Sequence, residues 1–327
     1  MDTLTLTTDR FRAMNTDIIV SLTVEPHPAG LHPAFRDARS WFAYSERTFS
    51  RFRPDSELSG LNLASGLPVK ISRTMEEVLL LARHYQRWTG GLFNPGILPQ
   101  LIQAGYSLSF ERLPKAPAGG PGKADFESAS GEREEPGPGS WKLFGPLQAV
   151  RLDKETQIDL GGIVKGWTVD RLTGWMTSKG ITAGLINAGG DLRVWGDADT
   201  PEWEIEIDDS RQPGETISAV SLRNGAVATS SVLGRRWMTK QGPRHHLIDP
   251  RTGKPAETDV LQCTVAGRWA AECEIAAKTV CLLGSQEGLR WLAHASPDSD
   301  ALVMTRDGGL KLHRSASPGS GRVWKGA

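Results

Sequence analysis

The sequence predicts an α+β protein, with several strands in direct succession and helices gathered in other stretches of the chain. Five strand-like segments follow one another between about residues 182 and 229 without a helix between them. Helical periodicity is confined to segments before residue 90, near 163–179 and after residue 270. No internal repeat of fixed period is present, and 327 residues are enough for a sizeable core. We expect one domain over residues 1–327.

The first part of the chain predicts a strand and three helices. Residues 10–24 alternate between apolar and polar types, as a strand does, and residues 32–48 have the pattern of a helix. The segment FSRFRPDSELSGLN then predicts a loop with a Pro-Asp turn that leads into a short helix. Residues 73–88 form a helix whose apolar face consists of Met75, Val78, Leu79, Ala82 and Tyr85.

The stretch from residue 107 to residue 146 differs in composition from the rest of the chain. It is rich in Gly, Pro, Ser and charged residues and cannot bury much apolar surface. We therefore expect a mobile insertion, of which residues 113–139 are dispensable for ligand binding.

After the insertion, strands and helices follow in mixed order. The predicted strands lie near 147–153, 156–159, 182–187, 191–195, 203–208, 217–222 and 225–229, with a last pair within 300–312. The predicted helices cover about 163–179, 270–283 and 285–295.

Charge and composition argue against a nucleic-acid partner, a membrane span and a disulfide framework. The chain carries 38 basic and 38 acidic residues, which does not favour nucleic acid as a partner. No stretch approaches the roughly 20 apolar residues of a membrane span. The polar start of the sequence does not resemble a signal peptide, so a cytoplasmic location is the expectation. Three cysteines without metal-type spacing argue against a disulfide framework.

The segment IDLGGIVKGWTVDRL, residues 158–172, places two glycines and Lys165 where a strand gives way to a helix. A helix N-terminus offers free N–H groups to a phosphate, and a lysine adds a charge. For this segment alone, a tight turn that needs small residues for packing is the better explanation. Three further segments of this kind, NAGGDLRVWG, AVATSSVLGRRW and RHHLIDPRTGKP, also follow strands. Together they predict one anionic-ligand site built from several loops.

The order of these motifs resembles the ApbE family of FAD:protein FMN transferases. FRAMNT resembles the entry strand of the family, with Asn15 where Gly is usual, and GGLFNPG resembles its Gly-x-Phe-Asp-Pro motif, with Asn94 where Asp is usual. Five further segments match the family motifs more closely: FSRFRPDSELSGLN, IDLGGIVKGWTVDRL, NAGGDLRV, AVATS and HLIDPRTGKP. The resemblance runs from Phe11 to about Gly284. It implies two intimately packed α/β halves, with the flavin site in the groove between them.

The resemblance also implies the substrate and the reaction. FAD would be split at its pyrophosphate, and FMN would pass to a Ser or Thr hydroxyl of a target flavoprotein while AMP leaves. The residues implied to bind FAD are Met14, Phe52, Leu92, Phe93, Asn94, Asp159 and Lys165, with Leu247 or Ile248 nearby. The alternatives are hydrolysis of FAD to FMN and AMP, and a flavin-binding protein without transferase activity.

Transfer to a hydroxyl requires a proton acceptor, and His246 is the better placed of two adjacent histidines. It precedes the apolar pair of the Asp-Pro motif, and an unperturbed imidazole titrates near neutral pH. The alternative is a histidine that only hydrogen-bonds a loop. Asp249 either orients His246 or caps the Pro-Arg-Thr-Gly turn.

The sequence departs from the family at its Mg²⁺ site. The resemblance implies a backbone carbonyl at Gly162 and an acid at Glu274 as ligands, but Lys278 stands where a Thr ligand is expected. Thr279 would lie about 100° away around the helix. An i,i+4 surface pair of Glu274 with Lys278 is the plain alternative. Our hypothesis is that the Lys278 ammonium takes over part or all of the role of the metal.

Overall fold

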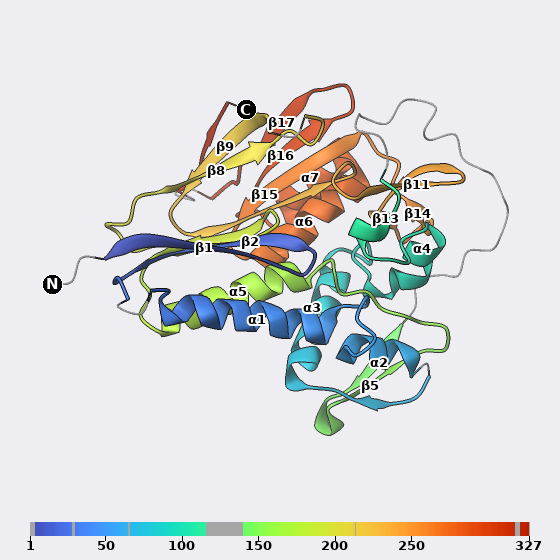
Figure 1. Cartoon of the computed structure of the whole chain (residues 1–327). Coiled ribbons are helices and arrows are strands. Elements are labelled where there is room, and N and C mark those ends of the chain that lie inside the picture. Colours follow the sequence, from blue (N-terminus) through green and yellow to red (C-terminus); the bar gives the residue numbers. More distant parts are fainter. Residues whose placement is uncertain are drawn as a thin grey trace.

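The centre of the structure, a computed structural model, is an eight-stranded antiparallel sheet (Figure 1). The structure describes residues 4–27, 30–64, 66–115, 140–212, 214–317 and 321–326. In spatial order the strands are β1 (Thr5–Ala13), β2 (Thr16–Val24), β6 (Gly184–Ala188), β7 (Asp191–Trp195), β10 (Gly225–Ser231), β15 (Val260–Gly267), β16 (Asp300–Thr305) and β17 (Leu310–His313). Together with the helices, this sheet confirms the predicted α+β class.

The first strand predicted from the sequence is a hairpin instead. β1 and β2 pair from Thr5 with Val24 to Ala13 with Thr16, so Met14 and Asn15 form a two-residue turn. Both turn residues have positive φ, 53° and 57°. Such turns suit the twist of a hairpin, and Asn tolerates this conformation better than most residues. The alternation of apolar and polar residues continues across the turn, so the sequence predicted one strand over residues 10–24 where the structure has two.

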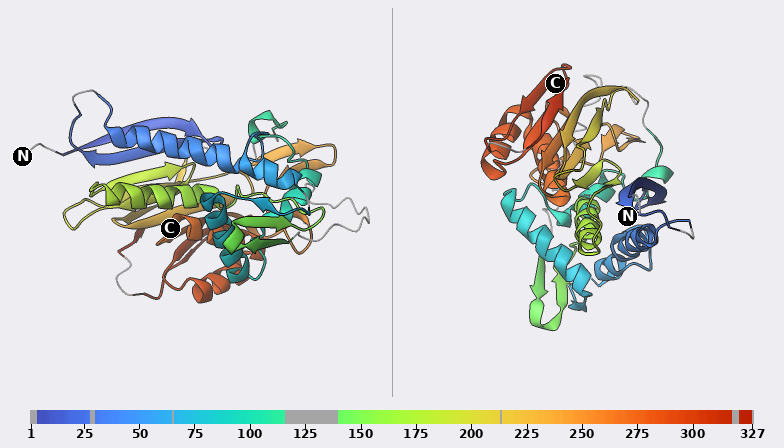
Figure 2. Two further views of the ribbon diagram at one scale, coloured as in Figure 1. Left: turned by 90° about the horizontal axis from the view of Figure 1, so that it is seen from below. Right: turned by 90° about the vertical axis from the view of Figure 1, so that its left-hand side faces the viewer.

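Four helices accompany the sheet: α1 (Pro33–Phe49), α5 (Val164–Ser178), α6 (Ala270–Leu283) and α7 (Ser285–Ala295). α1 and α5 lie side by side beneath the β1–β2 hairpin (Figures 1 and 2). Alternate residues of the central strands point to them, as Ala226 and Ala228 of β10 do, while Val227 points to the opposite face. The predicted helices are confirmed, but β15, whose residues are all buried, was missed because its eight residues do not alternate.

The opposite face of the sheet packs against a three-stranded sheet in the order β18 (Val323–Lys325), β9 (Thr216–Leu222) and β8 (Trp203–Asp208). Ile205, Ile207 and Val220 of this small sheet meet Leu192 and Val227 of the large one in a separate apolar cluster. The predicted strands 203–208 and 217–222 are thereby confirmed.

A second apolar core lies below the helices in Figure 1 and contains the remaining predicted helices. It is built from α2 (Glu57–Leu63), α3 (Arg73–Trp88) and a sheet in the order β3 (Val69–Lys70), β5 (Ala149–Leu152) and β4 (Trp141–Phe144). The five residues predicted for the apolar face of α3 are its buried residues. The prediction of a strand over 156–159 was wrong. The backbone there is held by the Asn62 side chain, which bonds both N–H and C=O of Ile158, at 2.8 and 2.9 Å.

The predicted insertion 107–146 has regular structure at both ends. A 3₁₀ turn covers Phe110–Arg112, Leu113 is buried, and Lys115 forms a bridge with Trp237. At the other end, β4 pairs with β5. Residues 116–139 lie outside the described residues. Residues 113–115, the described part of the segment predicted to be dispensable, thus contact the rest of the protein.

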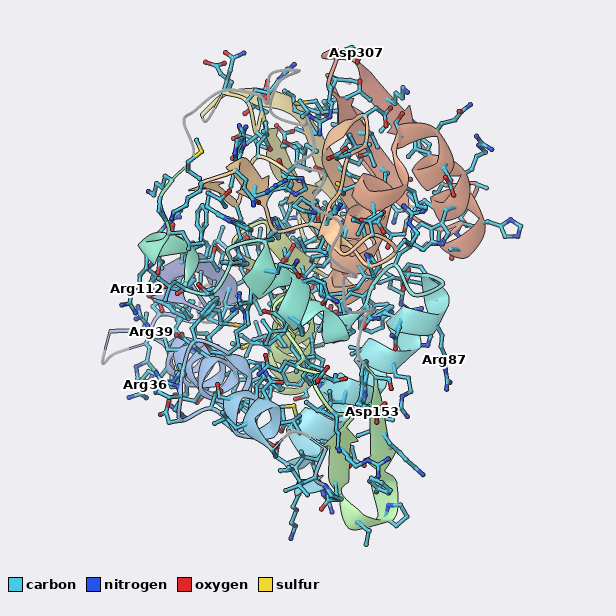
Figure 3. All side chains as sticks on the ribbon, turned by 90° about the vertical axis from the view of Figure 1, so that its right-hand side faces the viewer. Arg36, Arg39, Arg87, Arg112, Asp153 and Asp307 are labelled. Atoms are coloured by element: carbon cyan, nitrogen blue, oxygen red, sulfur yellow. The ribbon has the colours of Figure 1, made fainter. Side chains whose placement is uncertain are left out.

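Short elements complete the chain around one end of the large sheet. They are η1 (Pro95–Ile97), α4 (Leu98–Gln103) and the hairpins β11 (Arg236–Thr239) with β12 (Gly242–His245) and β13 (Ile248–Asp249) with β14 (Lys254–Pro255). Figure 3 shows charged side chains on the outside of the protein, such as those of Arg36, Arg87 and Asp307.

Among the described residues, no helix has the length and apolarity needed to cross a membrane. All three cysteines are buried free thiols.

Helices α5 and α6 touch at Gly166, and this contact allows a stability prediction. A Cβ on Gly166 would lie 2.6 Å from both the Cα and the N of Ala271, so the two helices would have to separate. We expect Gly166→Ala to lower the free energy of unfolding by about 2 kcal/mol. Gly174 in the same helix is exposed, and its added Cβ meets nothing within 4 Å. Gly174→Ala is the matched control and should stabilise by about 0.5–1 kcal/mol. Urea unfolding measures both, and equal effects would contradict the packing argument.

Candidate functional site

A pocket opens between the large sheet and the second core, and all four motif segments contribute to it. Its wall includes Gly161 and Gly162 before α5, Gly189 in the β6–β7 turn and Thr229–Ser231 at the end of β10. Residues 246–248 and one side of α6 close it. Gly189 has a φ of 64°, and a Cβ there would strike Thr16, so the turn requires glycine. The fold thus brings the four segments, far apart in the sequence, to one cavity.

Most of the residues predicted to form a site line this pocket. They are Phe52, Leu92, Phe93, Asn94, Asp159, Gly162, Lys165, His246, Leu247, Ile248, Glu274 and Lys278. Met14 lines a neighbouring pocket that shares Phe52, Asp159 and Lys165 with the first. Asp249 does not line either pocket.

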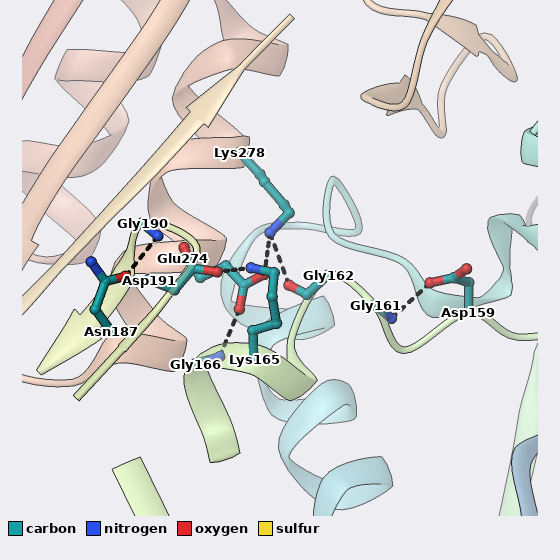
Figure 4. A network of polar contacts seen from close by, with 10 residues as sticks. All are labelled: Asp159, Gly161, Gly162, Lys165, Gly166, Asn187, Gly190, Asp191, Glu274 and Lys278. Atoms are coloured by element: carbon teal, nitrogen blue, oxygen red, sulfur yellow. Dashed lines mark hydrogen bonds and ion pairs between the residues drawn. The ribbon is translucent and has the colours of Figure 1, made fainter. Parts of the chain in front are cut away.

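The floor of the pocket holds two lysines and two acids in one network (Figure 4). Lys165 forms ion pairs with Asp191 and with Glu274, and Lys278 pairs with the same Oε1 of Glu274 at 2.7 Å. The other Glu274 oxygen accepts the N–H of Gly166 at 3.0 Å. Burial lowers the pKa of Lys165 to about 8, although the neighbouring Glu274 opposes the change. Two ammonium groups are therefore held at the base of a cavity by buried carboxylates.

The free N–H groups expected at the start of α5 are largely used within the protein. The N–H of Gly161 donates to Asp159 at 2.7 Å, and that of Gly166 donates to Glu274. Ile163 and Val164 donate to the Leu160 carbonyl. An anion in the pocket would therefore meet ammonium groups, not a bare backbone cradle.

His246 lies on the pocket wall with one ring nitrogen unsatisfied. Its Nδ1 is buried and has no hydrogen-bond partner among the described residues. Burial lowers the pKa of His246 well below 6.5, and the charges of Arg235 and Lys278 add to the effect. The ring is therefore neutral at pH 7, so one of its two nitrogens has a lone pair that can accept a proton. Its neighbour His245 is buried against the backbone of Ala256 and Leu247, which is a structural role.

Asp159 is tied to an arginine that the sequence did not single out. Arg51 donates to the Asp159 carboxylate and, at 2.7 Å, to the carbonyl of Tyr106. The Arg51 guanidinium also lies 4.1 Å from the centre of the Phe52 ring. The Asp159 side chain also accepts the N–H of Gly161, which closes a tight turn and shapes the loop beside the pocket.

The likeness to known proteins agrees with this geometry. The model of the ApbE family matches residues 14–303. The chain belongs to the ApbE family. It is 28% identical over 294 residues to an FAD:protein FMN transferase from Treponema pallidum, which covers 85% of this chain and 79% of that protein.

Two solved structures share the ApbE fold with this chain. The ApbE protein of Thermotoga maritima superposes with a TM-score of 0.79 at 20% identity, over 95% of this chain and 97% of the other. A flavin transferase ApbE from Vibrio cholerae superposes with a TM-score of 0.72 at 22% identity, over 96% and 98% of the two chains. The fold class predicted from the family resemblance is therefore confirmed.

The residues expected for an ApbE metal site do not leave room for a metal here. The Lys278 ammonium donates to the Gly162 carbonyl at 3.1 Å and to Glu274 at 2.7 Å, so it bonds both expected ligands. Thr279 lines the pocket, but its hydroxyl donates to the Ile275 carbonyl at 2.9 Å. Within the described ranges, no three His, Cys, Asp or Glu side chains are grouped to hold a metal ion.

Asp249 caps a turn, which is one of the two roles predicted for it from the sequence. Its carboxylate accepts from the backbone N–H and the side chain of Arg251, with an ion pair of 2.7 Å. Its carbonyl accepts the N–H of Gly253 at 2.8 Å. Among the described residues, Nδ1 of His246 has no hydrogen-bond partner, so Asp249 does not orient the ring through that atom. A catalytic role for Asp249 stays a prediction.

Several residues that line the ApbE pocket or the neighbouring one were not predicted as site residues, among them Arg51, Tyr106, Asp191 and Arg235. Asp191 and Arg235 stand in motifs that were singled out for their glycines and hydroxyls. A search for a charge to balance Lys165 would have selected Asp191. Tyr106 lies at the edge of the expected insertion and gives no local signal.

Proposed function

We propose that this protein is an FAD:protein FMN transferase, which moves FMN from FAD to a Ser or Thr hydroxyl of a flavoprotein. The observation that supports it most is the pairing, in one pocket, of a neutral histidine with two ammonium groups. Attack on a phosphoanhydride requires both a proton acceptor and positive charge near the phosphates. Membership of the ApbE family and the naming of its relatives agree with this proposal.

In this proposal the pocket divides the FAD molecule between two environments. The pyrophosphate lies over Lys165 and Lys278, whose ammonium groups face it with positive charge. Phe52 and Phe93 offer apolar surfaces to a ring of the substrate, and Leu92 and Leu247 extend this wall. Asn94 is held by its own turn, since its side chain accepts the N–H of Gly96 at 2.8 Å.

The chemical step then follows from the position of His246. The hydroxyl oxygen of the acceptor attacks the phosphorus of the FMN half, and its proton passes to Nδ1 of His246. The bond between that phosphorus and the bridging oxygen breaks, and the oxygen leaves with AMP. The ammonium groups of Lys165 and Lys278 stabilise the charge that grows on the phosphate oxygens.

A mass measurement on an acceptor protein tests the proposal. The enzyme is incubated with FAD and a panel of flavoproteins that carry surface Ser or Thr residues, and intact masses and free nucleotides are recorded. Covalent FMN on one acceptor, with an equal amount of AMP, is the expected result. Free FMN and AMP without an adduct would mean FAD hydrolysis, and neither product would mean a flavin-binding protein.

A further inference from the structure

We propose that the ammonium group of Lys278 takes the place of the divalent cation, so that this protein binds and uses FAD without Mg²⁺. The inference rests on the proposed function, because it assigns the charge that faces the FAD pyrophosphate. The feature behind it is Lys278, which stands where the family resemblance implies a Thr ligand of the metal.

The position of Nζ carries the inference. The ammonium lies between the Gly162 carbonyl and Glu274, the two oxygen donors expected to bind a metal, at 3.1 and 2.7 Å (Figure 4). Oxygen ligands of Mg²⁺ lie at about 2.0–2.1 Å, so a metal between these groups would overlap the ammonium. Lys278 is not a surface partner of Glu274, as the plain alternative held, because its side chain is 18% exposed and that of Glu274 is 2% exposed.

The surrounding structure holds Lys278 in this place. The N-terminus of α6 is fixed by Asp170 of α5, whose carboxylate accepts the N–H groups of Ala270 and Ala271, both at 3.0 Å. The stem of Lys278 passes close to Gly162, where a Cβ would lie 3.5 Å from its Cε. The ammonium is therefore positioned before any substrate arrives, which lowers the entropic cost of using it.

The charges in the pocket fit the exchange of a metal for a lysine. Lys165 and Lys278 balance Glu274 and Asp191, which leaves the cluster neutral. A Mg²⁺ with threonine at position 278 would leave one excess positive charge. Arg235, which also lines the pocket, adds a positive charge close enough to lower the pKa of both Lys165 and His246. With Arg235 included, the metal-free pocket carries one excess positive charge toward an FAD pyrophosphate, one fewer than the same pocket with Mg²⁺ and threonine at position 278.

The test is an FAD titration by calorimetry on the wild type, Lys278→Ala and Lys278→Thr, each in EDTA and in millimolar Mg²⁺. We expect the wild-type Kd for FAD to change less than about threefold between the two conditions. Lys278→Ala should bind FAD about 10- to 100-fold more weakly in both, which is the loss expected for one charge-assisted contact. Lys278→Thr should show the same loss in EDTA and recover most of its affinity in Mg²⁺. Titration of Mg²⁺ alone should detect binding only to Lys278→Thr.

The outcomes separate this inference from the proposed function. If the wild-type Kd for FAD rises more than tenfold in EDTA, the inference is overturned. The proposed function would still hold in that case, provided that FMN transfer to an acceptor is observed. Metal-independent FAD binding without any transfer would support the inference and count against the function. Lys179→Thr, at an exposed lysine after α5, is the control and should leave FAD binding unchanged. Both Lys278 variants should fold, because Lys165 and the Gly166 N–H still satisfy Glu274.

Discussion

Replacing His246 by asparagine should lower the rate of FMN transfer by roughly two to four orders of magnitude, while FAD binding changes little. The reason is geometric. Nδ1 of His246 is a buried polar atom of the pocket wall without a hydrogen-bond partner in the described part of the chain, and asparagine cannot take a proton from the attacking hydroxyl. Single-turnover transfer rates and an FAD titration on the same preparation measure the two effects separately.

The dependence on pH provides a second readout for the same variant. Because the pKa of His246 lies well below 6.5, wild-type kcat/KM should not fall between pH 7 and pH 6 through this group, and should fall only at more acidic pH. His246→Asn should lack that acid limb. His294→Asn, at an exposed histidine of α7, is the control and should transfer at the wild-type rate. A His246→Asn enzyme that turns over normally but binds FAD weakly would assign His246 to substrate positioning.

The fold could be read from the sequence wherever a segment had a clear period. The apolar face of α3 was predicted residue by residue, because one buried stripe at helical spacing fixes both the type and the orientation of a helix. β15 and the β1–β2 turn were missed for opposite reasons. β15 is buried on both faces and has no alternation, whereas the hairpin kept its alternation through the turn at Met14 and Asn15.

The site could be predicted from the sequence as a set of segments, but not as a set of contacts. The family resemblance selected Lys165, Glu274 and Lys278, and all three line the pocket. It could not show that Asp191 balances Lys165, because that ion pair joins β7 to α5 and depends on how the two elements pack. Likewise, the sequence left open whether Asp249 orients His246 or caps a turn, and the structure shows its carboxylate bound to Arg251 of that turn.

The charge network makes a second large effect predictable: Glu274→Gln should lower the free energy of unfolding by about 3 kcal/mol at pH 6. Glu274 is 1% exposed and accepts from Lys165, Lys278 and the Gly166 N–H. Glutamine keeps the shape but removes the charge, so Lys165 keeps the Asp191 carboxylate while Lys278 keeps the Gly162 carbonyl and loses its carboxylate partner. Urea unfolding of the two proteins measures the difference.

The sign of the pH dependence distinguishes lost charge from disturbed packing. Burial alone would raise the pKa of Glu274, but the ammonium groups of Lys165 and Lys278 outweigh it and lower the pKa from 4.5 to about 2. A depressed carboxyl pKa stabilises the folded state above pH 4.5, and this stabilisation is lost as the pH falls toward 2. The difference between wild type and Glu274→Gln should therefore be full at pH 6 and shrink progressively below pH 4.5, where protonated Glu274 comes to resemble glutamine. Glu287→Gln, at an exposed position of α7, should change stability by less than about 0.5 kcal/mol at any pH. A difference for Glu274→Gln that stayed constant down to pH 3 would mean that shape or hydrogen bonding, and not the charge facing Lys165 and Lys278, holds this part of the pocket together.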